Sequence, residues 1–278
     1  MMDIQRIAAF ALNGQGGNPA GVVLLDEMPS ADVMQQVAAD VGYSETVFAA
    51  PLGNGFRTRY FAPQAEVAFC GHATIALGAA LGGAHGAGVY PLILNDTEVS
   101  VEAVADGDGW ASILQSPSTN YRTADPELVA QALKMFGWNA DDIDPTLEIT
   151  QVNGGAEHLM IPLKNHTSLQ NMAYDFDTGA ALMQAFNLVT INLIWRGENG
   201  TIHSRNPFAG HGVYEDPATG AAAAALAGYL RDAGHGDQPF DIFQGEDMGV
   251  ASFLHVAPLP GKGAAVRISG ATRAIVAP

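Results

Sequence analysis

Short runs of apolar residues, separated by glycine, asparagine and aspartate, dominate this chain. Runs of this length, rich in β-branched and aromatic residues, predict β-strands. In the first half they fall at 4–12, 20–25, 46–49, 56–61, 66–69, 89–94, 97–103 and 110–115. In the second half they fall at 149–152, 157–163, 188–195, 201–206, 240–244, 251–257, 264–269 and 274–276. The pattern therefore predicts a chain built mainly of short strands.

Helical spacing is confined to a few segments with recognisable ends. Ser30 is a predicted N-cap for a helix through Asp40, in which Val33, Val37 and Val41 give an apolar stripe. A second helix is predicted to begin at Asp125-Pro126, with an apolar face of Leu128, Ala132 and Phe136, and Asp177 is predicted to cap a third.

Two further helices are rich in alanine, and each follows a strand and a glycine. One begins at Cys70-Gly71-His72 and is predicted to end before Gly82 and Gly83, and the other, at 221–230, follows the motif EDPATG. Such helix starts direct backbone N–H groups and the positive end of the helix dipole into a pocket. Two similar starts, one in each half, suggest a duplicated fold with a site between the halves.

The order of these elements sets the fold class. A Rossmann fold requires regular alternation of strand and helix, which is absent here. We expect an α+β fold of two domains, each a curled, mainly antiparallel sheet around a helix. The segment 116–123 is the best candidate for the join. The expected domains are 1–116 and 117–278, with the last strand free to return to the first domain.

Composition narrows the function. Of the 278 residues 48% are hydrophobic, and the net charge is −17, which argues against nucleic acid and anionic membranes as partners. The single cysteine excludes an internal disulfide and a cysteine-rich zinc site. No apolar run approaches membrane-spanning length, and the N-terminus lacks a secretory signal pattern. We expect a cytoplasmic protein without a metal ion.

Four motifs in order, GGNPAGVV, SETVF, FCGHATIALGAAL and YEDPATGAAAAAL, resemble the PhzF family, the phenazine-biosynthesis-like isomerases. They lie between Gly16 and Leu230, so the resemblance covers most of the chain. It implies the diaminopimelate-epimerase-like fold, with two pseudo-symmetric barrels each enclosing a helix. It also implies a homodimer and a cofactor-independent isomerase that acts on a small anionic carboxylate.

The resemblance also implies roles for particular residues. Glu45 of the SETVF motif is the expected catalytic acid/base, with His72 and Asp216 opposite it in the cleft. Gly71 and Gly220 are expected to donate backbone N–H groups to the substrate. The neighbouring residues expected to bind substrate are Ala73, Thr219 and Ala221.

Each catalytic candidate has an ordinary structural alternative. Glu45 could be a solvated carboxylate at a strand edge, without a role in catalysis. A partly dry pocket would instead raise the pKa of Glu45 toward the working pH and allow it to transfer protons. His72 could be a cap or a core hydrogen-bonding residue. Asp216-Pro217 is a common dipeptide at helix starts. Cys70 is either a buried inert thiol or a nucleophile activated by His72 and the helix dipole.

Two departures from the family pattern bear on the substrate. Ala221 stands where the family commonly has serine, and the segment from Gln244 to Gly249 resembles the family motif QGxxMGRPS but continues without its Arg and Pro. Two other functions stay open. A two-thiol racemase would need a second cysteine, and a binding protein of the same fold would have lost efficient chemistry.

Overall fold

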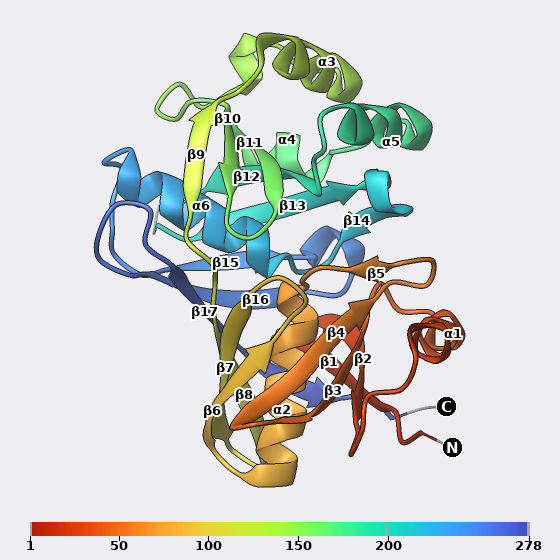
Figure 1. Cartoon of the computed structure of the whole chain (residues 1–278). Coiled ribbons are helices and arrows are strands. Elements are labelled where there is room, and N and C mark those ends of the chain that lie inside the picture. The colour runs from red at the N-terminus through yellow and green to blue at the C-terminus, as the bar shows by residue number, and fades with distance from the viewer. Residues whose placement is uncertain (1, 198–199, 277–278) are drawn as a thin grey trace. The chain divides into compact units, whose positions relative to one another are not determined.

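The computed structural model describes residues 2–197 and 200–276 (Figure 1). They form two compact units. Unit 1 comprises the chain up to Gln115 and from Ile268 onward, and unit 2 comprises Ser116–Arg267. The sequence placed the boundary one residue later, between 116 and 117, and the assignment of domains stays a prediction.

Unit 1 is a sheet that closes on itself. β1 pairs with β2, and the ladder continues through β3, β4, β6, β7 and β8 to β17, which pairs with β1. Most of these pairs are antiparallel, while β2–β3 and β4–β6 are parallel. The strands are β1 (Gln5–Ala11), β2 (Asn18–Leu24), β3 (Thr46–Leu52), β4 (Gly55–Phe61), β5 (Glu66–Val67), β6 (Gly88–Ile93), β7 (Glu98–Asp106), β8 (Gly109–Gln115) and β17 (Val266–Ala274).

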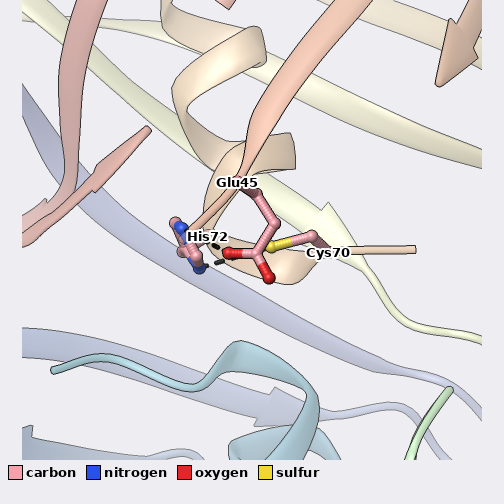
Figure 2. A group of neighbouring side chains, drawn as sticks. All are labelled: Glu45, Cys70 and His72. Carbon is pink, nitrogen blue, oxygen red and sulfur yellow. Dashed lines mark hydrogen bonds and ion pairs between the residues drawn. The ribbon is translucent and has the colours of Figure 1, made fainter. Parts of the chain in front are cut away.

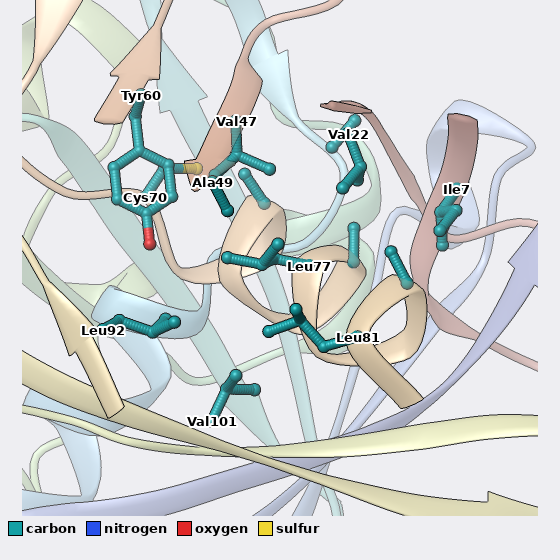
Figure 3. Packing of buried hydrophobic residues seen from close by; sticks show 14 of the residues in the cluster. Ile7, Val22, Val47, Ala49, Tyr60, Cys70, Leu77, Leu81, Leu92 and Val101 are labelled. Carbon is teal, nitrogen blue, oxygen red and sulfur yellow. The ribbon is translucent and has the colours of Figure 1, made fainter. Parts of the chain in front are cut away.

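Helix α2 (Gly71–His85) is enclosed by this barrel, and every residue from Gly71 to Gly82 is buried. Figure 3 shows strand side chains packed around it, including Val22, Val47 and Leu92. A helix that is apolar all round can be stable only when it is surrounded. Its small residues allow the strands to approach closely on every side.

The end predicted for this helix at Gly82 and Gly83 is wrong, because α2 continues to His85. A Cβ at Gly82 would lie 2.6 Å from Cε3 of Trp110. The glycine therefore makes room for an indole ring and does not end the helix.

Helix α1 (Ala31–Val41) packs outside the barrel, and its predicted apolar stripe is wrong at Val33, while Val37 is partly buried against the core. Its buried residues are Met34 and Ala38, whereas Val33 is 43% exposed. Residues spaced by four drift about 40° per step around a helix of 3.6 residues per turn, so three valines at that spacing leave one face. Met34 and Ala38 instead pack in a small cluster with Phe48 and Phe61.

Unit 2 also has a mixed sheet that is mainly antiparallel. Its ladder runs β9–β10–β11–β12–β13–β15–β16, with β11–β12 and β13–β15 parallel, and β14 pairs with β13. Its strands are β9 (Asn120–Thr123), β10 (Thr150–Asn153), β11 (Glu157–Leu163), β12 (Thr190–Arg196), β13 (Ile202–Phe208), β14 (Val213–Asp216), β15 (Phe240–Gln244) and β16 (Ser252–Pro258). The predicted strands at 264–269 and 274–276 are replaced by the single strand β17.

Helix α6 (Gly220–Asp232) is the central helix of unit 2, and all its residues from Ala222 to Leu230 are buried. In each unit the central helix connects two parallel strands: α2 lies between β4 and β6, and α6 lies between β13 and β15. The shared topology agrees with the duplication predicted from the two alanine-rich segments.

The other helices of unit 2 are α3 (Pro126–Phe136), α4 (His166–Gln170) and α5 (Phe176–Ala185). The predicted start and face of α3 are confirmed, because the Asp125 side chain accepts a hydrogen bond from the Glu127 N–H and Leu128, Ala132 and Phe136 are buried. The predicted cap at Asp177 is wrong. Asp175 caps α5 and accepts hydrogen bonds from both the backbone N–H and the hydroxyl of Thr178.

In the described ranges, none of the helices has the length and apolar character needed to cross a bilayer.

Buried polar side chains bond to one another on strands β11, β12 and β13. His158 Nδ1 lies 2.7 Å from Thr190 Oγ1, and that hydroxyl donates to Asn206 Oδ1. The Thr190 hydroxyl uses its only hydrogen in this bond, so Nδ1 of His158 is the protonated nitrogen. Its Nε2 has no hydrogen-bond partner among the described residues. Burial lowers the pKa of His158 to about 3.

His158 predicts a loss of stability in mild acid. The unfolded histidine takes up a proton below its ordinary pKa near 6.5, and the folded one does so only near 3, so between these values the proton favours unfolding. The unfolding free energy of the parent should fall by about 1.4 kcal/mol per pH unit more steeply than that of His158→Gln in this window. Urea titrations of both proteins at pH 7, 6 and 5 measure the difference. Parallel pH profiles would contradict the neutral, buried histidine.

Candidate active site

Glu45 lies where α1 has ended and β3 begins. Gly42 closes α1 in the left-handed conformation, and the chain reaches β3 through Ser44 and Glu45. Gly21 of β2 donates its N–H to the Glu45 carbonyl, and a Cβ there would lie 2.7 Å from Thr46 Oγ1. The β2–β3 pairing therefore fixes the backbone at Glu45. Its side chain is buried, with Glu45 only 7% exposed, so it is not the solvated carboxylate of the alternative interpretation.

His72 is the second residue of α2 and lies against Glu45. Its Nε2 is 3.4 Å from Glu45 Oε2 and 3.4 Å from Ser44 Oγ. Its Nδ1 is 3.3 Å from Cys70 Sγ. Both ring nitrogens thus have neighbours. Figure 2 shows the side chains of Glu45, Cys70 and His72 converging at the start of α2.

The backbone at Cys70 is fixed by a chain of hydrogen bonds. The hydroxyl of Thr74 donates to the Cys70 carbonyl at 2.7 Å, and the phenol of Tyr60 is 2.6 Å from the same hydroxyl. Because Thr74 has one hydroxyl hydrogen and uses it on the carbonyl, Tyr60 is the donor. Burial raises the pKa of Tyr60, which keeps this donor protonated. Two hydrogen bonds in series, from Tyr60 to Thr74 and from Thr74 to the Cys70 carbonyl, therefore fix the backbone at Cys70.

Glu45, Cys70 and His72 bring three possible metal-ligand atoms within 4.8 Å of one another. Carboxylate oxygen, thiolate sulfur and imidazole nitrogen are all ligands that zinc accepts. An ion would have to take one imidazole nitrogen away from the neighbour it has in this structure. The present geometry is a chain of contacts, with the Glu45 carboxylate 3.4 Å from one imidazole nitrogen and the Cys70 thiol 3.3 Å from the other, and the expectation of no metal stays a prediction.

Asp216 is the last residue of β14 in unit 2 and is buried. The alternative interpretation, an ordinary helix-start aspartate, is wrong for α6, because the N-cap position is Thr219. Asp216 Oδ2 instead accepts a hydrogen bond of 2.6 Å from the Thr219 hydroxyl. Gly220 is the first residue of α6, as Gly71 is of α2, and Ala221 takes the position that His72 has in α2.

The structure thus groups the predicted residues within their own units. In unit 1 it brings Glu45 and His72 into contact, with Gly71 and Ala73 in the same first turn of α2. In unit 2 it gathers Asp216, Thr219, Gly220 and Ala221 at the start of α6. Their functional assignment stays a prediction.

Sequence reasoning gave Ser44 no role and treated Cys70 mainly as an inert core thiol. The spacing Cys-x-His across a helix start is the signal that pairs Cys70 with His72, because an N-cap residue and the second helical residue lie on the same turn. Ser44 gave no comparable signal, because its contact with His72 joins segments 28 residues apart.

A family model described as "Phenazine biosynthesis-like protein" matches residues 7–277. The chain belongs to the phenazine biosynthesis-like protein family. An uncharacterized isomerase of Mesorhizobium japonicum is 31% identical over 94% of this chain and 92% of the relative. The trans-2,3-dihydro-3-hydroxyanthranilate isomerase of Pseudomonas fluorescens is 30% identical over 89% of this chain and 87% of the relative. The prediction of an isomerase of the PhzF family is confirmed.

Solved structures confirm the fold prediction. A predicted epimerase of Pseudomonas aeruginosa superposes with a TM-score of 0.84 over 99% of this chain and 98% of its own, at 22% identity. A probable proline racemase of Agrobacterium radiobacter reaches 0.67 over 99% of this chain and 91% of its own, at 12% identity. The PhzF-family chain therefore has the predicted α+β, diaminopimelate-epimerase-like fold.

The geometry at Cys70 predicts its reactivity. The thiol is buried, with Cys70 8% exposed, so iodoacetamide should alkylate it on the order of a hundredfold more slowly in the folded protein than in urea. Because the chain has one cysteine, mass spectrometry of the intact protein reads this rate directly. Rapid alkylation of the folded protein below pH 7 would instead support the thiol nucleophile.

Proposed function

We propose that this PhzF-family protein is a cofactor-independent isomerase that moves a proton between two carbons of a small, carboxylate-bearing metabolite. The observation that carries the proposal is the buried contact between Glu45 and His72 at the start of α2. A carboxylate shielded from water and placed beside an imidazole is suited to general acid/base catalysis. The family relationship makes isomerisation the reaction class.

In this mechanism Glu45 removes a proton from a carbon next to a carbonyl, a carboxylate or a conjugated diene, and returns it to another carbon. His72, in contact with Glu45 Oε2 through Nε2, orients the carboxylate and assists the transfer. Charge that develops on the substrate's oxygens requires donors in place before the reaction. The first backbone N–H groups of α2, beginning at Gly71, have no partners within their own helix and can fill this role.

We assign the start of α6 to the same reaction. Asp216 orients the substrate and assists the transfer, and Thr219, Gly220 and Ala221 bind it. The support is the likeness of EDPATG to the family motif and the burial of the Asp216 carboxylate beside a helix start. Ala221 offers no hydroxyl, so the anionic group is bound there by backbone N–H groups alone.

We also propose that the protein is a cytoplasmic homodimer. The family resemblance supports the homodimer, and a sequence with a single cysteine supports the cytoplasmic location.

The decisive variant is Glu45→Gln, which keeps the shape of the side chain but cannot accept the proton. Turnover should fall by about a hundredfold or more while affinity for the ligand stays nearly intact. Deuterium incorporation from heavy water into trans-2,3-dihydro-3-hydroxyanthranilate, and into a panel of small acids with an acidic C–H, measures turnover. Isothermal titration calorimetry measures affinity.

Glu66→Gln is the matched control. Glu66 is a partly buried carboxylate of the same unit, but it forms an ion pair with Arg59. This variant should keep parental turnover. A Glu45→Gln protein that also turns over like the parent would remove Glu45 from the mechanism. Tight binding of an acid by the parent, with no deuterium exchange, would favour the binding-protein alternative.

Independence from a metal ion is tested separately at the Glu45–Cys70–His72 cluster. Dialysis against a chelator should leave deuterium incorporation unchanged, because the proposed step uses only protons and hydrogen bonds. Metal analysis of the dialysed protein by mass spectrometry provides the control. Activity that disappears with the chelator and returns with zinc would make the cluster a metal site.

A further inference from the structure

The motif that begins at Gln244 has no role in the mechanism above, yet it contacts the loop that carries Asp216. Gln244 is the last residue of β15 and is 2% exposed. The motif continues through Gly245 into a single 3₁₀ turn, Glu246–Met248. All of it belongs to unit 2, as does the loop from Asp216 to Thr219.

The side-chain amide of Gln244 binds both ends of this loop. Its Nε2 donates to the Asp216 carbonyl at 2.7 Å and to Thr219 Oγ1 at 3.0 Å. Its Oε1 accepts from the Thr219 N–H at 3.1 Å. One buried amide thus uses both of its donors and its acceptor on the residues that begin and end the loop.

These bonds also fix the direction of the Thr219 hydroxyl. The oxygen accepts a hydrogen from Gln244, so the hydroxyl's own single hydrogen points to its other neighbour, Asp216 Oδ2, at 2.6 Å. Without the amide the hydroxyl could rotate to another acceptor. A hydrogen bond to a carboxylate is strongest when the carboxylate is ionised.

Gly245 allows the close approach that these bonds need. It has a φ of +75°, in the left-handed region that favours glycine. A Cβ at this position would lie 2.8 Å from the carbonyl oxygen of Pro217 and 2.7 Å from that of Val250. The backbone of the motif therefore packs directly on the loop between Asp216 and Thr219.

We propose that Gln244 is a positioning residue, which holds the Asp216–Thr219 loop at both ends and directs the Thr219 hydroxyl to the Asp216 carboxylate. The inference rests on the proposed role of Asp216 in the reaction. It gives the Gln-Gly pair a function of its own: the amide fixes the loop, and the glycine lets the two backbones meet.

The first experiment needs no substrate. In Gln244→Leu the Thr219 N–H loses its acceptor, so amide hydrogen exchange in peptides covering 216–222 should speed up by about tenfold. Gln151→Leu is the matched control. Gln151 is also a buried glutamine of unit 2, and its amide bonds to the Asp125 N–H and to Glu157, away from this loop. Equal exchange at 216–222 in the parent and Gln244→Leu would overturn the proposal.

The second experiment measures turnover by deuterium incorporation. Gln244→Leu and Thr219→Val should each lower kcat by about tenfold, and the acid limb of the pH–rate profile should move to higher pH because ionised Asp216 has lost its donor. Gln151→Leu should keep both the parental kcat and the parental profile. The variant that combines Gln244→Leu with Thr219→Val should be no slower than Gln244→Leu alone, because both substitutions interrupt the same hydrogen-bond path.

The outcomes separate this inference from the function on which it rests. Parental turnover in Glu45→Gln would overturn the proposed function, whatever Gln244 does. Parental turnover and an unmoved pH profile in Gln244→Leu, in an enzyme that Glu45→Gln impairs, would overturn the positioning role alone. A turnover loss in Gln244→Leu that Gln151→Leu shares equally would make both glutamines purely structural.

Discussion

The burial of a helix of small residues against a curled sheet is the constraint on which each unit depends. A strand can pass close to a helix axis only where the helix has small residues, which explains the alanine and glycine in α2 and α6. The fit is tight enough to require glycine at some positions. A Cβ at Gly78 would lie 2.6 Å from Ser112 Oγ, and one at Gly228 would collide with Thr119. Both neighbours are strand or loop residues of the same unit, so each helix is fixed against translation and rotation.

A helix fixed in this way also fixes whatever lies at its first turn. In unit 1 that turn carries His72 against Glu45, and in unit 2 it follows Asp216. Under the proposed function these are reacting groups, which must be held to within a fraction of an ångström, and a tightly packed scaffold does this better than a mobile loop. His72 and Asp216 are therefore placed at the starts of the two most tightly packed helices, α2 and α6.

The sequence was sufficient for the fold class and for the motifs, because both depend on local signals. Turn residues separate the strands, and Asp125-Pro126 begins a helix by its own chemistry. The predicted end of α2 and the predicted face of α1 were wrong because each depends on a residue distant in the sequence. Gly82 in α2 leaves room for Trp110, and the buried face of α1 is the one that packs against Phe48 and Phe61. The same limit holds at the site: Glu45 and His72 were recognised by family pattern, but the contacts of Ser44 with His72 and of Gln244 with Thr219 join segments that no local pattern links.

The return of β17 to unit 1 has a consequence for biosynthesis. Residues 271–274 of β17 pair with β1, so the unit that is translated first lacks a barrel strand until all of unit 2 has been made. Unit 2 spans one continuous segment, and its last residue leaves the ribosome before that strand does. The nascent α2, apolar on all sides, therefore waits in an incomplete enclosure while the second half of the chain is synthesised. Protection of that helix by ribosome-associated chaperones would be most valuable during this interval.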